Sequence, residues 1–181
     1  GSNQSTRINT ITKALKEGYS SDGTTSYINE NILADAVSQD DVFYALQINN
    51  MTGDLRNGVT NASYQGIYRG FNGSEVGIAM SGGAVTVINA TAGTTPGGDY
   101  FVSGVRDNSA EFDLWVDGVN KTTVTNSSTT NPSSNIETLA ANFIGGGGGR
   151  FFSNSANIVG INIIGKATEV DQAVLYTAVD N

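Results

Sequence analysis

The segment Glu111-Phe112-Asp113-Leu114-Trp115-Val116-Asp117-Gly118 decides the fold. Its apolar residues Phe112, Leu114 and Val116 occur at every second position, which is the period of a β-strand with one face toward a core. The Asp-Gly pair that follows favours a tight turn between antiparallel strands. We therefore predict a half-buried strand that turns back at Asp117-Gly118, with its three apolar side chains in the interior.

The same alternation recurs along the chain, separated by turn-forming Gly, Asn, Asp and Ser residues. It is found in segments 42–48, 76–80 and 100–106, and shorter apolar strands are expected around 143–144 and 159–164. Many short strands joined by turns indicate an all-β protein. We predict a two-sheet antiparallel β-sandwich of the jelly-roll type.

The beginning of the chain has a different period. Ile8, Ile11 and Leu15 are spaced as on one face of a helix, and Gly18 follows as a stop. We predict a helix over residues 5–17, within an N-terminal arm of residues 3–18, before a single jelly-roll domain of residues 19–181. Residues 1–2 resemble a cloning scar. The helix either packs on its own domain or docks on a partner.

Composition narrows the function. The 181 residues include 9 basic and 17 acidic ones, a net charge of −8, and contain neither Cys nor His. An acidic chain without a basic cluster is repelled by nucleic acid and by anionic membranes, so we expect neither as a partner. The missing histidine removes the commonest general base. We expect an extracellular or virion-surface location.

The chain resembles laminin G-like, concanavalin A-like lectin modules. The resemblance is carried by an ordered set of segments: 22–28, 112–119, 143–146, Phe152 with 160–163, and a short closing helix at 167–176. It departs from the family at Asp99-Tyr100-Phe101, where many relatives have a Trp-His pair. The resemblance implies a jelly roll with a short C-terminal helix. It also implies a range of roles, from glycan binding and adhesion to structural proteins of bacteriophages.

Catalysis is not expected. Related glucanases carry a Glu-x-Asp-x-x-Glu motif, in which two carboxylates attack and protonate the sugar bond. Glu111 and Asp113 match its first two acids, but Val116 stands where the third belongs. A valine cannot donate a proton, so we predict no catalytic residues and no enzyme. A glycoside hydrolase with an incomplete motif is the remote alternative.

A ligand platform is the first binding hypothesis. Glu111, Asp113 and Trp115 lie on the side of the strand opposite its apolar face, where an indole can stack on a sugar ring. The alternative is a tryptophan that shields the sheet. Tyr64 and Tyr68 form a second aromatic group, for which a place in the core is the other interpretation.

Calcium is the only cofactor that the sequence suggests. Asp113, Asp117, Asp40 and Asp41 supply the carboxylate oxygens that calcium prefers, and related folds use this ion. The alternative is a set of solvated acids on an acidic protein.

Two functions remain. In the first, the protein is a non-catalytic bacteriophage virion protein, a head decoration or a tail-associated, receptor-binding subunit. Its N-terminal helix then mediates self-assembly or docking on the virion. In the second, it is an extracellular bacterial carbohydrate-binding or adhesion module. The expected partner is accordingly a glycan or a protein surface.

Overall fold

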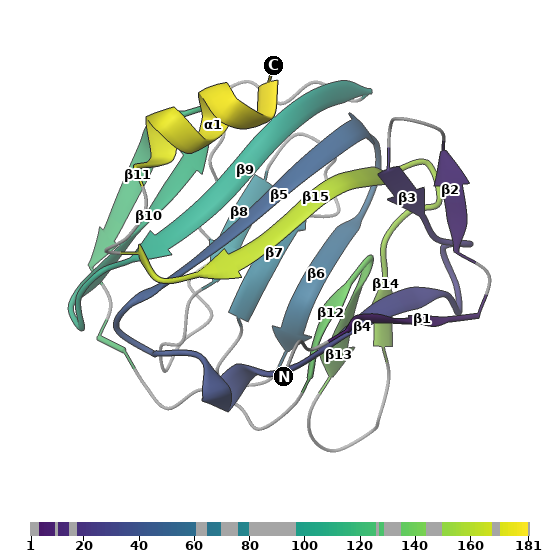
Figure 1. The fold of residues 1–181 in the computed structure, drawn as a ribbon, viewed down its shortest axis with the longest axis horizontal. Coiled ribbons are helices and arrows are strands. Elements are labelled where there is room, and N and C mark those ends of the chain that lie inside the picture. Colours follow the sequence, from purple (N-terminus) through teal and green to yellow (C-terminus); the bar gives the residue numbers. More distant parts are fainter. Residues whose placement is uncertain are drawn as a thin grey trace.

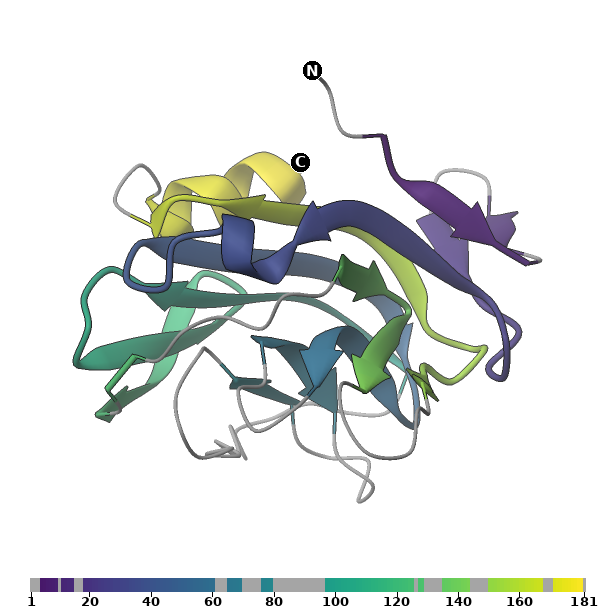
Figure 2. The ribbon, with the colours of Figure 1, turned by 90° about the horizontal axis from the view of Figure 1, so that it is seen from below.

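The computed structural model describes residues 4–9, 11–14, 18–60, 65–69, 76–79, 97–125, 127–128, 135–143, 150–167 and 171–180. Two β-sheets are stacked face to face, and one helix lies on the outer face of one of them (Figures 1 and 2). This architecture confirms the predicted all-β sandwich.

Along the chain, successive groups of one to three strands belong to alternate sheets. They are β1 (Thr6–Ile8), β2 (Thr12–Ala14), β3 (Gly18–Ser20), β4 (Tyr27–Leu33), a 3-10 turn η1 (Ala34–Ala36), β5 (Val42–Met51), β6 (Leu55–Thr60), β7 (Gln65–Arg69), β8 (Val76–Ala79), β9 (Gly98–Arg106), β10 (Glu111–Val116), β11 (Val119–Thr125), β12 (Asn135–Thr138), β13 (Ala140–Phe143), β14 (Arg150–Phe152), β15 (Ile158–Gly165) and α1 (Gln172–Asp180).

Both sheets are built almost wholly from antiparallel pairs. As described, one sheet has seven strands in the order β11-β10-β9-β5-β15-β3-β2. The other has eight, in the order β1-β4-β12-β6-β13-β14, with β7 beside β6 and β8 beside β7. β13 pairs with β6 in parallel. Because β1 and β2 belong to different sheets, the beginning of the chain contributes to both layers.

Strand β10 behaves as its sequence predicts. Phe112, Leu114 and Val116 are 2%, 0% and 4% exposed, and they lie in the core between the sheets. Asp117 and Gly118 both have positive φ, at 52° and 71°. Two-residue turns of this kind match the twist of the strands on either side, so the pair closes the hairpin between β10 and β11. The three side chains predicted to face the interior do so.

A second apolar cluster lies outside the sandwich, under α1. Phe43, Ala45 and Phe101 are buried there, with half-buried helix residues packed on them. Asp171 begins the helix because its Oδ1 accepts hydrogen bonds from the backbone amides of Ala173 and Val174 at 3.0 and 3.1 Å. The predicted closing helix is therefore confirmed, although it starts at Gln172 rather than at residue 167.

The predicted helix over residues 5–17 is wrong. Residues 6–8 form β1, which pairs with β4, and residues 12–14 form β2, which pairs with β3. Asn9, with φ 58°, lies between them. Short helices are marginal in water, and β-branched Thr and Ile fit a strand better, so pairing with an available sheet edge prevails over the helical spacing.

Candidate functional site

One hollow lies where β1, β4 and β12 of one sheet meet β3 and β15 of the other. We call it the edge pocket; its volume is about 240 Å³. It is lined by Ser5, Arg7, Tyr19, Ile28, Glu30, Thr138, Val159, Gly160 and Asn162. It brings together strands from opposite ends of the chain, and none of its polar residues was predicted as a site residue.

A β-bulge explains how Asn162 enters this pocket. Val159 pairs with Ile48, and the register of β15 then shifts, so that Ile161 pairs with Gln47 and Asn162 with Leu46. The extra residue, Gly160, reverses the alternation. Val159 and Asn162 consequently both lie on the inner face, whereas strict alternation from Val159 would turn Asn162 outward.

Glu30 is the centre of the polar network in the edge pocket. Its Oε2 accepts a hydrogen bond from the Ser5 hydroxyl at 2.5 Å, and its Oε1 accepts one from the Thr138 hydroxyl. The Asn162 amide donates to the same Oε1 at 3.0 Å and to Thr138 Oγ1 at 2.7 Å. Three donors thus converge on one carboxylate and connect the two sheets.

The oxygen of the Asn162 amide has no hydrogen-bond partner in the described part of the chain. The amide Nδ2 must face Glu30, because a carboxylate accepts hydrogen bonds and would repel a carbonyl oxygen. Oδ1 therefore points away; it is buried and has no hydrogen-bond partner among the described residues. A buried acceptor without a donor costs free energy, so this atom favours an incoming donor group.

Tyr19 and Arg7 form an ordered pair at the same pocket. The Arg7 guanidinium carbon lies 4.6 Å from the centre of the Tyr19 ring, and Nη2 donates to the Tyr19 hydroxyl at 3.0 Å. Arg7 is exposed and makes no ion pair with an acidic residue in the part of the chain that the structure describes. Because β1 and β3 lie in different sheets, this pair also spans the two layers.

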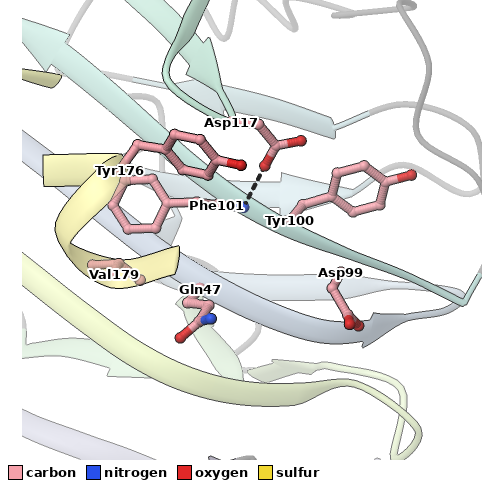
Figure 3. A pocket seen from close by; sticks show the side chains of 7 residues that line it. All are labelled: Gln47, Asp99, Tyr100, Phe101, Asp117, Tyr176 and Val179. Carbon is pink, nitrogen blue, oxygen red and sulfur yellow. Dashed lines mark hydrogen bonds between the residues drawn. The ribbon is translucent and has the colours of Figure 1, made fainter. Parts of the chain in front are cut away.

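A smaller hollow of about 100 Å³ lies on the outer face of the seven-stranded sheet, beside α1 (Figure 3). Its lining includes Asp99 and Asp117, and each carboxylate is held by a backbone amide. Asp117 Oδ1 accepts from Phe101 N, and Asp99 Oδ1 from Asn50 N, both at 2.8 Å. Asp117 connects the β10–β11 turn to β9, and Asp99 connects β9 to the end of β5, so these acids have a structural role.

The predicted platform residues are placed as expected relative to the sheet. Glu111 is exposed, and Asp113 and Trp115 are half-buried, on the face of β10 opposite its buried residues. Asp113 accepts a hydrogen bond from the Thr123 hydroxyl on the neighbouring strand. Of the predicted site residues, only Asp117 lines either hollow. Tyr68 belongs to β7, but only the backbone of this residue is described. Tyr64 lies outside the described residues.

The four predicted calcium ligands are not brought together. Among the described residues, no three acidic, Cys or His side chains are grouped so that they could hold a metal ion. Asp40 has another role: burial lowers the pKa of the Arg106 guanidinium, and the negative charge of Asp40 opposes this shift. The backbone amides of Asp40 and Asp41 both donate to the Ser38 hydroxyl.

Comparison with known proteins identifies the fold but no family. Neither a family model nor a curated protein matches the chain. A mutant of Trypanosoma rangeli sialidase with trans-sialidase activity has a TM-score of 0.63 at 12% identity, over 96% of this chain and 29% of that one. A botulinum neurotoxin type C structure, described as dependent on two ganglioside molecules for cell entry, has a TM-score of 0.60 at 12% identity. That match covers 97% of this chain and 46% of the toxin chain.

These matches support the two-sheet sandwich, but they do not identify the laminin G-like or concanavalin A-like family. They also correct one prediction. We expected no enzyme, yet the matched structures include a Trypanosoma rangeli sialidase held as a covalent intermediate. Val116 interrupts one glucanase motif only, and a part of the sialidase chain, 28% of its length, matches this fold. No helix among the described residues is long and apolar enough to cross a membrane.

Proposed function

We propose that this protein is a glycan-binding module and that the sugar occupies the edge pocket. The observation that carries the proposal is the buried Asn162 Oδ1, fixed by Glu30 and without a donor among the described residues. A sugar presents hydroxyl groups that donate hydrogen bonds, and one of them would satisfy this acceptor.

The remaining walls suit a sugar ring as well. The half-buried Tyr19 forms one wall of the pocket together with Arg7, whose guanidinium lies over its ring. Val159 and Ile28 provide buried apolar surface. The lining is carried mainly by strands of two stacked sheets, and rigid elements hold binding groups more precisely than loops do.

The solved structures give this proposal independent support. One is a Trypanosoma rangeli sialidase in complex with sialic acid, with a TM-score of 0.58, and another is the toxin that interacts with gangliosides. Those ligands belong to those proteins. For this chain they make a glycan the first ligand class to test, and an extracellular location is part of the same proposal.

The Trp115 platform is the alternative position for the sugar. It is supported by the half-exposed indole beside Glu111 and Asp113 on the outer face of β10. The virion role loses its main support, because the helix that was expected to dock on a partner is replaced by β1 and β2. Glycan recognition is therefore the function that we propose.

A glycan array with the wild-type chain and three variants tests the proposal. Tyr19→Ala and Asn162→Ala should each lower binding about tenfold or more, because they remove one wall of the pocket and the buried acceptor. Trp115→Ala should bind like the wild type. A loss confined to Trp115→Ala would move the site to the outer face of β10, and no binding to any glycan would refute the function.

A further inference from the structure

We infer that the edge pocket selects acidic sugars and binds their carboxylate through Arg7. This inference rests on the proposed function and specifies the class of glycan. The feature that carries it is the guanidinium of Arg7, which is held in position and has no acidic partner among the described residues. A neutral sugar does not require such a group.

The guanidinium is oriented before any ligand arrives. One of its five N–H groups donates to the Tyr19 hydroxyl, so that four donors remain, and its carbon lies 4.6 Å from the centre of the same ring. Arginine in this state presents a fork that matches the two oxygens of a carboxylate. The ordering of a long side chain, which usually opposes binding, is largely complete.

The other charged group in the pocket is already engaged. Both oxygens of Glu30 accept hydrogen bonds from Ser5, Thr138 and Asn162. Glu30 therefore positions Asn162 and offers little to a ligand. A ligand meets one cationic fork, one amide acceptor and the Glu30 carboxylate, whose oxygens already have neutral donors.

This pair of groups defines the ligand chemistry. The carboxylate of an acidic sugar would accept hydrogen bonds from Arg7, and a hydroxyl of the same sugar would donate to Asn162 Oδ1. A basic ligand would be repelled by Arg7. With an overall charge of −8, the protein as a whole does not attract anions. Attraction of an anionic ligand therefore depends on Arg7 itself.

Matched pairs of probes separate the carboxylate from the rest of the sugar. Calorimetric titrations would compare 3′-sialyllactose with lactose, and glucuronate with glucose. We expect the acidic member of at least one pair to bind about 10- to 100-fold more tightly, which is the range for a charge-assisted contact. This preference should decrease as NaCl is raised, because the ionic contact is partly exposed.

Variants then assign the preference to Arg7. Arg7→Gln should bring the acidic-to-neutral ratio close to one while neutral binding persists, and Arg7→Lys should retain part of it. Tyr19→Phe keeps the ring but removes the hydroxyl that anchors Arg7, so it should also lower the ratio. Lys121→Gln, on exposed strand β11, removes the same charge elsewhere and should leave the ratio unchanged.

The outcomes distinguish the two proposals. If no glycan of the array and neither member of either pair binds, both the proposed function and the acidic preference are refuted. If neutral and acidic sugars bind equally, or if the preference survives Arg7→Gln in a variant that unfolds like the wild type, only the acidic preference is overturned.

Discussion

The side-chain amide of Asn162 donates a 3.0 Å hydrogen bond to Oε1 of Glu30, which joins β15 of one sheet to β4 of the other. The two residues are 132 positions apart in the chain. This contact places polar groups in the lining of the edge pocket, whereas the core between the sheets consists mainly of apolar side chains. It makes Glu30 important both for stability and for the shape of the site.

Removal of the Glu30 carboxylate should destabilise the protein. Glu30→Ala leaves the donors of Thr138 and Asn162 without their acceptor, and we expect a loss of about 1–3 kcal/mol in the free energy of unfolding. Glu30→Gln retains one acceptor oxygen and should lose less. Urea denaturation of both variants measures this, and wild-type stability of Glu30→Ala would contradict the role of the network.

The turn before β4 should make stability depend on acid pH. The Thr25 hydroxyl and the backbone amides of Thr25, Thr24 and Ser26 hold the pKa of Asp22 well below its usual range. A carboxylate with a lowered pKa in the folded state stabilises the fold fully above its unfolded pKa, about 3.9. This stabilisation decreases as the pH falls below that value toward the folded pKa.

Asp22→Asn tests this dependence. The variant should have a lower Tm than the wild type at pH 7, and the difference should shrink as the pH is lowered from about 4 to 2. Thermal unfolding across this range provides the measurement. A difference in Tm that stays constant with pH would show that the charge of Asp22 does not contribute.

The close approach of β3 to β15 should not tolerate a side chain at Gly18. A Cβ built there lies 2.1 Å from the Val159 carbonyl oxygen, and φ is +127°. Gly18→Ala should therefore cost at least about 2 kcal/mol and displace β3, which carries Tyr19. We expect the Gly18→Ala molecules that remain folded to bind the glycan with lower affinity than the wild type does.

Gly53→Ala is the matched control. Its φ is +62°, and its Cβ would meet the end of the Asn154 side chain, away from the edge pocket. It should lower the Tm but leave the affinity of the folded protein unchanged. Equal effects of both glycine variants on affinity would show that β3 does not position the site.

The two faces of β10 should respond differently to truncation. Leu114 is fully buried between the sheets, so Leu114→Ala should cost about 2–5 kcal/mol through lost burial and the cavity that it leaves. Trp115 is half-buried on the opposite face, and Trp115→Ala should cost less. Chemical denaturation measures both, and a greater loss for Trp115→Ala would assign the larger packing role to the outer face.

The local sequence pattern was sufficient to predict those features that depend on residues close together in the chain. The alternation of Phe112, Leu114 and Val116 identified the buried face of β10, because successive side chains of a strand point to opposite sides. Asp117-Gly118 identified the hairpin, because both residues tolerate positive φ. The helical spacing of Ile8, Ile11 and Leu15 misled, since it carries no information about which sheet edge is available for pairing.

The sequence by itself therefore predicted the all-β class, the turn at Asp117-Gly118 and the buried face of β10, because alternation and turn residues are signals between neighbouring residues. Only the tertiary structure decided where the edge pocket lies. The pocket needs a bulge at Gly160 that turns Asn162 inward, and strand pairings that bring Arg7 to Tyr19 and Glu30 to Asn162. Those contacts depend on how distant strands are ordered and registered, which no local period encodes.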